Sequence, residues 1–395
     1  MIIDNILEKG ETYFDKENLE ELEKHRFKAI AETAKHQFES CASYRRFCKQ
    51  KNFNPLGDLK STKDISKIPY LTTANFKKKA GKPKELLCVP EKNIQVWTLS
   101  SGTSGDPSMI GRDNINIVRF FRAMHMVFSV ISNCTEYNWS LMFQPPVRQR
   151  FTIKDIVQEP QHHMSYIFNV ENRLPMDKRV YALKMASDAV KKQGKMFEFD
   201  SENTFGFLNA NPKAKGYGWI GGAVPIIYSS LKGYYDKTGQ VCDVGEESFL
   251  IFGGGWKTYS GPAITPEKFR DDMSKILGIP TNHILDTYSF TETDCFLSEC
   301  EYHNKHCLPW QDIVVRDVET LEPVEMGEKG LINLINPIAY SFAGVSILQD
   351  DIAKITMENE CPCGRQGKIV EIVGRAEGVE ARGCGAQIAD ETLTK

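Results

Sequence analysis

The sequence has almost no net charge and no long apolar run, and these absences exclude several classes of protein. Its 49 lysines and arginines nearly balance 52 aspartates and glutamates, giving a net charge of −3. A chain this close to neutral has no general attraction for nucleic acid or an anionic membrane. No stretch approaches the roughly 18 apolar residues of a membrane-spanning helix, and the N-terminal region is too charged for a signal peptide. The sequence therefore predicts a cytoplasmic protein with no transmembrane segment and no nucleic-acid partner.

A secretory context is also missing for the 11 cysteines. An odd number of cysteines in a reducing compartment is typical of buried thiols, metal ligands or nucleophiles. We therefore expect free thiols in this chain, and not a framework of disulfides.

Internal repeats and low-complexity tracts are absent, and the chain alternates between helical and extended patterns. Apolar residues recur at helical spacing within 17–49, which predicts a helical arm. Thr265, Pro266 and Glu267 have the order of a hydroxyl cap, a first-turn proline and a first-turn acid, which predicts that a helix begins there. A further helix is expected at 114–131, and strands at 94–99, 139–143, 248–252 and 283–290. Such alternation indicates an α/β fold.

The stretch LSSGTSGDPS, from Leu99 to Ser108, follows the first of these strands and precedes the helix at 114–131. Glycines and small hydroxyl residues leave the backbone N–H groups free to approach an anion closely. The stretch has neither the spacing of a Walker phosphate loop nor that of a dinucleotide-binding fingerprint. The residues alone leave two interpretations open, a phosphate cradle or a flexible surface loop.

The loop resembles the phosphate loop of the adenylate-forming superfamily, which includes the acyl-CoA synthetases and luciferases. The matching residues are Ser100, Ser101, Gly102, Thr103, Ser104, Gly105 and Pro107. Ser108 stands where that family usually has a lysine. Four further resemblances follow in the family's order: the glycines Gly253, Gly254 and Gly255, the run Tyr288-Ser289-Phe290-Thr291-Glu292, the run Asp351-Ile352-Ala353-Lys354, and Gly374-Arg375.

The resemblance implies a role for each of these segments in binding ATP. The glycines line the adenine pocket, Tyr288 packs on adenine and Thr291 contacts phosphate. Glu292 helps to hold Mg²⁺, Asp351 binds the ribose hydroxyls, and Arg375 belongs to a hinge. These groups suit the attack of a carboxylate on the α-phosphate of ATP, which forms acyl-AMP and releases pyrophosphate.

Within the superfamily, the segments 252–261, 308–337, 361–367 and 374–385 resemble the LuxE-type acyl-protein synthetases. That resemblance implies activation of a fatty acid, transfer of the acyl group to a cysteine of the synthetase, and an acyl reductase as partner. Two alternatives stay open: a CoA ligase of the phenylacetate-CoA ligase branch, and an adenylate-binding protein without catalytic activity.

The resemblance also implies the large N-terminal domain of the adenylate-forming enzymes, with β-sheets flanked by helices. We expect a helical N-terminal region at 1–90, the adenylate-forming domain at 91–373 and a short tail at 374–395. Only 20 residues follow Arg375, so the family's mobile C-terminal lobe and its lysine are expected to be missing. Lys257, after the glycine run, is a candidate substitute for that lysine.

Cys384 is the candidate acyl-accepting nucleophile. It lies between Gly383 and Gly385, which allow the backbone to move, and Arg382 nearby favours the reactive thiolate. Its position after the hinge matches that of the family's acyl-accepting cysteine.

A separate set of cysteines and histidines has the pattern of a tetrahedral zinc site, in which two close pairs lie far apart in the sequence. The run from Cys300 to Cys307 includes His303 and His306, and Cys361 and Cys363 follow about 55 residues later. The resemblance to the phenylacetate-CoA ligase branch selects Cys300, His306, Cys361 and Cys363, with His303 and Cys307 as substitutes. Four protein ligands would make the zinc structural.

Overall fold

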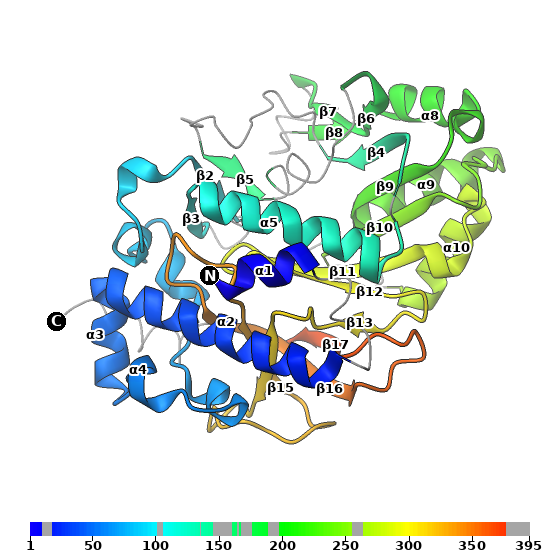
Figure 1. Cartoon of the computed structure of the whole chain (residues 1–395). Coiled ribbons are helices and arrows are strands. Elements are labelled where there is room, and N and C mark those ends of the chain that lie inside the picture. The colour runs from blue at the N-terminus through cyan, green and yellow to red at the C-terminus, as the bar shows by residue number, and fades with distance from the viewer. Residues whose placement is uncertain are drawn as a thin grey trace.

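A computed structural model of the chain describes residues 1–9, 18–100, 106–134, 136–144, 160–163, 166, 176–188, 197–254 and 264–376. Figure 1 shows a central sheet with helices packed on both sides. The helices are α1 (Ile2–Lys9), α2 (Leu19–Ser40), α3 (Ala42–Gln50), α4 (Pro55–Asp58), α5 (Asn114–Met126), α8 (Ser201–Asn209), α9 (Val224–Thr238) and α10 (Pro266–Leu277). The mixed α/β architecture confirms the fold class that the sequence predicts.

The central sheet has 12 strands among the described residues. In spatial order they are β14 (Asp312–Arg316), β15 (Gly330–Ile335), β16 (Ser346–Glu358), β17 (Lys368–Arg375), β13 (Lys305–His306), β12 (Cys295–Glu299), β11 (Ile284–Phe290), β10 (Phe249–Gly253), β9 (Gly218–Ala223), β4 (Trp139–Phe143) and β6 (Arg179–Tyr181), and β1 (Leu71–Thr72) pairs with β16. The strands from β11 to β6 are parallel, whereas those from β14 to β12 pair in the antiparallel sense. The sheet therefore changes from antiparallel to parallel pairing at β11.

Helices cover both faces of the parallel half, as its sequence requires. Ile220 and Leu250 point to the face covered by α8, α9 and α10, while their neighbours Trp219 and Ile251 point to the face covered by α1 and α5. All four side chains are almost completely buried. Continuous apolar runs are typical of parallel strands that are buried on both faces, and this is why the short apolar runs at 139–143 and 248–252 are strands.

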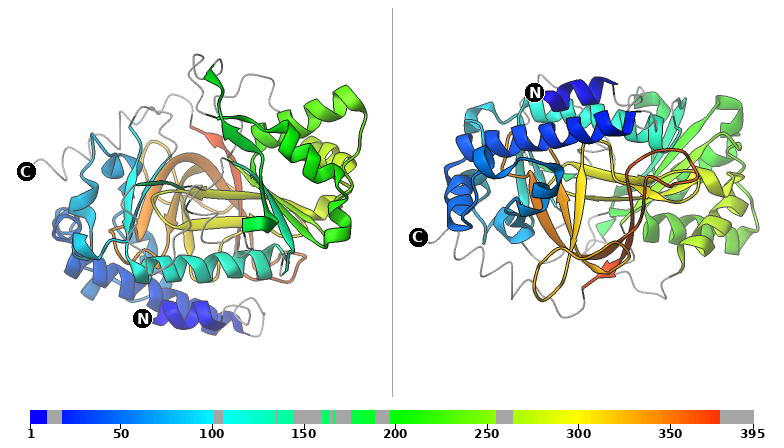
Figure 2. Two further views of the ribbon diagram at one scale, coloured as in Figure 1. Left: turned by 90° about the horizontal axis from the view of Figure 1, so that it is seen from above. Right: turned by 60° about the horizontal axis from the view of Figure 1, so that its bottom comes forward.

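The helices α1, α2 and α5 lie side by side on one side of the molecule, as both views in Figure 2 show. The helix α2 is held to the antiparallel half by buried polar contacts. The Gln37 amide donates to the Ala339 carbonyl at 2.6 Å and accepts from the Val345 N–H at 3.1 Å. Because both polar atoms of the Gln37 amide have partners, this side chain can be buried on the irregular segment without leaving an unsatisfied group.

Two smaller sheets complete the described part of the chain. One has the order β3-β2-β5, formed by β2 (Val96–Leu99), β3 (Met109–Arg112) and β5 (Gln161–His162). The other is the hairpin of β7 (Leu183–Met185) and β8 (Phe197–Phe199).

Most elements agree with the sequence patterns. The predicted arm at 17–49 is two helices, because Cys41 adopts an extended conformation between α2 and α3 and its sulfur accepts a hydrogen bond from the Tyr44 N–H. Thr265 caps α10 as expected, since its hydroxyl accepts from the Lys268 N–H at 3.2 Å. The predicted helix at 114–131 is α5 followed by one π-helical turn, Val127–Ile131.

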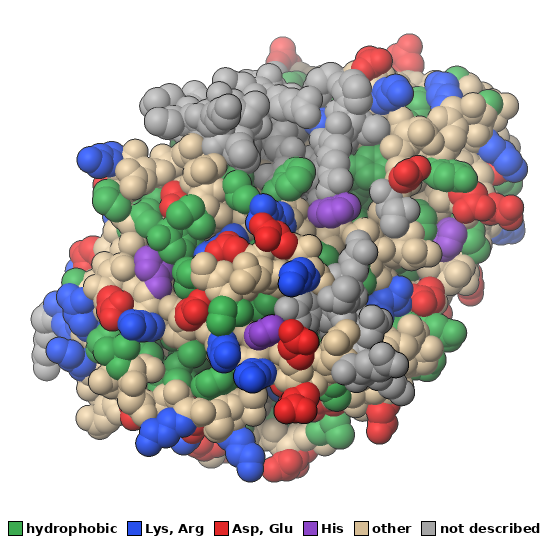
Figure 3. All heavy atoms as spheres, in the orientation of Figure 1, with side chains coloured by type: hydrophobic (Ala, Val, Ile, Leu, Met, Phe, Trp, Pro, Cys, Tyr) green, Lys and Arg blue, Asp and Glu red, His purple; other side chains and the backbone are tan. Residues whose placement is uncertain are grey.

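Surface charge and helix hydropathy agree with what the composition predicts. On the face shown in Figure 3, basic and acidic side chains are interspersed over the described surface. No helix in the described ranges combines the length and the apolar character needed to cross a lipid bilayer.

Candidate functional site

The candidate phosphate loop connects β2 to β3, and both of its ends are well defined. The Ser100 N–H donates to the Ser108 carbonyl at 3.0 Å, and the Ser108 N–H donates to the Ser100 hydroxyl at 2.8 Å. Residues 101–105, which include the predicted Ser101, Gly102, Thr103, Ser104 and Gly105, lie outside the described residues. The loop is thus closed at its base by reciprocal hydrogen bonds between two serines.

One strand next to this loop was not predicted. The helix expected from residue 114 is α5, which begins at Asn114, but β3 lies between the loop and that helix. The loop therefore joins two antiparallel strands, and a helix N-terminus does not follow it directly. The pattern Met-Ile-Gly-Arg is too short for its pairing with β2 to be read from the sequence.

The predicted residues Thr291 and Glu292 lie in the turn between β11 and β12. Both side chains are nearly completely buried. Burial raises the pKa of the Glu292 carboxyl above its ordinary range, because a carboxylate loses its hydration there. A buried carboxyl at the end of a parallel strand is suited to bind a cation that replaces the lost water.

A buried ion pair that the sequence did not predict fixes this turn to β3. Arg112, at the end of β3, donates from Nε to the Asp294 carboxylate at 2.7 Å and from a terminal nitrogen to the Thr291 carbonyl at 2.8 Å. It also contacts the Thr98 hydroxyl on β2. Both members of the pair are buried, and Asn116 on α5 provides a further contact to Asp294. The sequence gives one indication of this pair, which is that Arg112 and Asp294 each lie close to one of the family motifs.

The predicted glycines lie at the end of β10, next to β11. A side chain at Gly253 would begin 2.7 Å from the Thr287 hydroxyl, so the two parallel strands could not accommodate it. Gly254 adopts a positive φ of 69°, which favours glycine. The predicted residues Gly255 and Lys257 lie outside the described residues. The end of β10 is thus shaped by the close approach of β11 at Gly253 and by the positive φ of Gly254.

Two predicted residues from separate motifs meet directly. The Tyr288 hydroxyl, on β11, donates to the Asp351 carboxylate, on β16, at 2.8 Å. Asp351 is also the cross-strand partner of Arg375 at the end of β17. The Arg375 guanidinium lies 3.7 Å from the neighbouring Asp350, whose pKa is raised by burial. The structure therefore gathers Tyr288, Asp351 and Arg375 into one cluster.

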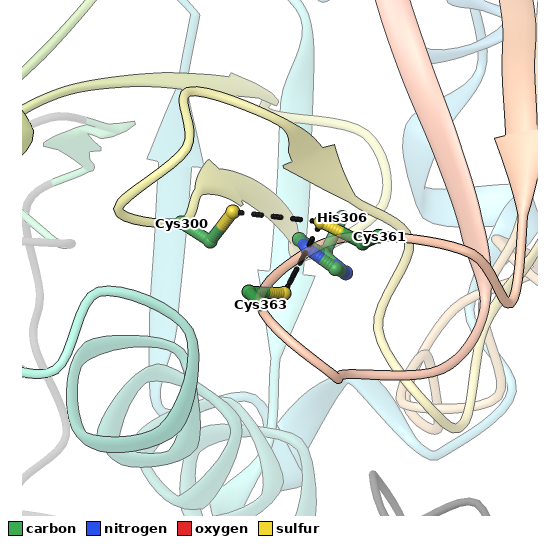
Figure 4. Close-up of side chains that lie close together, drawn as sticks. All are labelled: Cys300, His306, Cys361 and Cys363. Atoms are coloured by element: carbon green, nitrogen blue, oxygen red, sulfur yellow. Dashed lines mark hydrogen bonds between the residues drawn. The ribbon is translucent and has the colours of Figure 1, made fainter.

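The other predicted cluster consists of Cys300, His306, Cys361 and Cys363 (Figure 4). Their potential ligand atoms all lie within 4.8 Å of one another. Cys363 Sγ lies 3.3 Å from His306 Nε2 and 3.2 Å from Cys361 Sγ, which in turn lies 3.8 Å from Cys300 Sγ. Zinc–sulfur bonds of about 2.3 Å in a tetrahedron place sulfur atoms about 3.8 Å apart. The four side chains are therefore compatible with one tetrahedral metal ion.

The local chain geometry explains how these ligands meet. Cys300 follows β12 and His306 lies on β13, while Cys361 and Cys363 lie in the connection between β16 and β17. Because β13 pairs with β17 at His306 and Ile369, the two hairpins are held together. The predicted substitutes lie elsewhere: His303 Nδ1 lies 3.5 Å from Glu299, and the buried Cys307 contacts the Leu308 carbonyl.

The electrostatics of this cluster favour deprotonated sulfur. Hydrogen bonding to Cys300 and to His306 holds the pKa of Cys363 well below that of a free thiol. Burial would raise the pKa of Cys361, but its hydrogen bonds, that to His306 first, lower it overall. The thiolate is the form that binds metals. The whole of β12 separates the cluster from the turn that holds Glu292, a length of roughly 17 Å.

The candidate nucleophile Cys384 lies outside the described residues. Nine cysteines can be assessed as free thiols, and eight of these are buried. Cys363 is the half-buried exception, and it belongs to the cluster of four. No thiol among these nine is therefore both exposed and uncommitted.

Comparison with solved structures identifies the fold. The chain is similar to a 2-hydroxyisobutyryl-CoA ligase in an open conformation in complex with 2-HIB-AMP and CoA, with a TM-score of 0.64 and 17% identity over 90% of this chain and 75% of that one. The same ligase in a postadenylation state gives a TM-score of 0.64 and 16% identity, covering 92% and 69% of the two chains. The fold is thus that of the adenylate-forming ligases.

Comparison of sequences identifies the family within this fold. The chain is 26% identical over 374 residues to a long-chain-fatty-acid–luciferin-component ligase of Aliivibrio fischeri, covering 94% of this chain and 90% of that one. It is 25% identical over 355 residues to the protein of the same name from Vibrio harveyi, covering 89% and 84%. The family model described as "Acyl-protein synthetase, LuxE" matches residues 2–169 and 193–394. The chain therefore belongs to the LuxE family of acyl-protein synthetases.

Proposed function

We propose that this chain uses ATP and Mg²⁺ to activate a long-chain fatty acid as acyl-AMP and then holds the acyl group as a thioester on Cys384. In the first step a carboxylate oxygen of the acid attacks the α-phosphorus, and the bond to the leaving pyrophosphate breaks. In the second step the Cys384 thiolate attacks the acyl carbon, and AMP leaves. A partner acyl reductase would then receive the acyl group. The names of the relatives support the acid and the reaction class.

The observation that carries the proposal is the hydrogen bond between Tyr288 and Asp351. These residues come from two separate motifs, 63 positions apart, and a nucleoside site needs both. An aromatic ring can stack on adenine while a neighbouring carboxylate accepts hydrogen bonds from the ribose. The missing Cβ of Gly253 allows the Thr287 hydroxyl on the adjacent strand to approach closely, which keeps the end of β10 against β11.

The remaining residues have roles at the phosphates and the hinge. The loop from Ser100 to Gly105 would supply backbone N–H groups and hydroxyls to the phosphates, and Thr291 would add a hydroxyl. Glu292 is suited to hold Mg²⁺, because its buried carboxyl lacks solvent and a cation would restore its charged form. The ion would neutralise charge on the phosphates during the transfer. Lys257 is a candidate for a second positive charge, and Arg375 belongs to the proposed hinge.

The experiment that tests this function is ATP–pyrophosphate exchange with a panel of carboxylic acids. Acyl-AMP formation is reversible, so exchange that depends on the acid is its direct readout. We expect exchange with long-chain fatty acids, without added coenzyme A, and acylation of the protein. Absence of exchange with every acid would favour an adenylate-binding protein without activity. Exchange followed by acyl transfer only to coenzyme A would favour a ligase of the phenylacetate-CoA type.

We further propose that Cys300, His306, Cys361 and Cys363 bind one structural Zn²⁺. The interatomic distances and the lowered pKa values of Cys361 and Cys363 fit such a site. The set has four protein ligands and leaves no position for a substrate, which is typical of structural zinc.

Protein prepared without chelator is expected to contain about one zinc per chain. Cys361→Ser should lose the metal and unfold several degrees lower, because metal binding contributes directly to the free energy of folding. Elemental analysis and thermal unfolding would measure both effects. Cys307→Ser is the matched control, since that buried thiol lies next to His306 but outside the cluster: it should keep its zinc whatever its stability. Metal-free wild-type protein would show that the cluster consists of buried thiols alone.

A further inference from the structure

Lys77 lies beside the exit of the candidate phosphate loop, although it precedes that loop by more than 20 residues. It forms an isolated antiparallel bridge with Ser108. The next residue, Lys78, donates its N–H to the Pro107 carbonyl at 2.9 Å. Two strand-like segments therefore run side by side here, and Lys77 is the cross-strand neighbour of a residue that has no charge.

The surrounding contacts hold Lys77 in place. Phe76 is buried in the core and meets Phe342 edge to face. The Asp106 carboxylate accepts from the N–H groups of Lys79 and Ala80, each at 2.9 Å. Gly81 then turns back so closely that a Cβ there would lie 2.7 Å from the backbone of Lys77. Contacts made by the residues before and after Lys77 therefore fix its position relative to the loop exit.

The Lys77 side chain is half-buried, whereas the side chains of Lys78 and Lys79 are exposed. Its positive charge acts on two carboxyl groups of the candidate site, Glu292 and Asp350. No hydrogen bond or ion pair occupies its ammonium group within the described parts of the chain. Arg112 also acts on Glu292, but its charge is already neutralised by Asp294. Among the described residues, Lys77 is therefore a cation at the site with no hydrogen-bonded or ion-paired counter-charge.

We propose that the ammonium group of Lys77 binds the phosphates of ATP at the exit of the loop. Lys77 then supplies from a neighbouring segment the positive charge that Ser108 does not provide on the loop itself. A triphosphate carries enough negative charge to compensate this ammonium group and to bind a cation at Glu292 at the same time. The inference rests on the proposed function, because it assumes that ATP binds at this loop.

The test compares Lys77→Ala and Lys77→Arg with wild-type protein. A charge-assisted hydrogen bond typically contributes enough to change affinity about 10- to 100-fold. Lys77→Ala is expected to raise the KM for ATP in the exchange assay by this factor and to leave the KM for the fatty acid unchanged. Lys77→Arg keeps the charge and should retain most of the ATP affinity. Lys78→Ala, an exposed neighbour on the same segment, is the matched control and should behave like wild type.

A binding measurement separates phosphate contact from a structural role. ATP carries more negative charge than AMP, so Lys77→Ala should weaken ATP binding more than AMP binding, as measured by calorimetry without fatty acid. Equal losses for both nucleotides, or an unchanged KM for ATP, would overturn the inference while the wild-type exchange still supported the proposed function. A wild-type protein that neither exchanges pyrophosphate nor binds ATP would overturn both. Thermal unfolding of each variant shows whether the fold is intact.

Discussion

Glu292→Gln is expected to reduce fatty-acid-dependent ATP–pyrophosphate exchange by about 100-fold or more. The substitution keeps the shape of the side chain but removes the charge that would hold Mg²⁺ against the phosphates. The fold should survive. Burial raises the pKa of Glu292 in the folded state, so this carboxyl lowers the stability as the pH rises from its ordinary pKa to the raised one, and the loss is complete above the raised pKa. An uncharged glutamine is therefore expected to maintain or increase the midpoint of thermal unfolding at neutral pH.

Glu202→Gln provides the matched control, because Glu202 is an exposed acid in the first turn of α8. It should leave exchange unchanged. A second readout follows the metal itself: raising the Mg²⁺ concentration should restore part of the activity of Glu292→Gln. Exchange close to the wild-type rate in Glu292→Gln at low Mg²⁺ concentration would show that this carboxylate has no part in adenylation.

The second large effect is expected at Cys384. With ATP, Mg²⁺ and a labelled fatty acid, the wild-type protein should acquire a label that survives denaturation and is released by neutral hydroxylamine, as a thioester is. Cys384→Ala should lose this label completely while pyrophosphate exchange continues at the wild-type rate. The two half-reactions separate because the thiol takes part only after acyl-AMP has formed.

Cys242→Ala is a suitable control for the labelling, since Cys242 is buried and burial raises the pKa of its thiol to about 11. This variant should keep the label. Label that persists in Cys384→Ala would identify another cysteine as the acceptor. Exchange without any stable label in the wild-type protein would instead favour coenzyme A as the acceptor.

Local patterns were sufficient wherever the determining interactions are local. The strand predicted at 139–143 coincides with β4, because an apolar run bounded by turn residues already specifies a buried strand. The cap at Thr265 depends on residues within one helical turn. The spacing of cysteines and histidines also predicted a metal site, and the resemblance to the phenylacetate-CoA ligase branch selected the four ligands that the structure brings together.

Pairing between distant segments could not be predicted in the same way. The strand β3 exists because β2 lies beside it, and its four residues carry too weak a pattern to reveal this. Arg112 and Asp294 lie 182 positions apart, and neither has a local feature that selects the other. The bridge between Lys77 and Ser108 is likewise a tertiary contact. These long-range pairs determine the geometry of the candidate site, whereas the motifs determine only its composition.

The buried pair of Arg112 and Asp294 has a consequence for the order of events during synthesis. A ribosome-bound chain that ends before residue 294 would contain the loop and Arg112 but not the carboxylate that neutralises this arginine. A buried guanidinium without a counter-charge is strongly unfavourable, so β3 cannot settle in its final place in such a fragment. Nucleotide binding is therefore expected to emerge abruptly, late in translation, and nascent chains that end before residue 294 should bind no ATP.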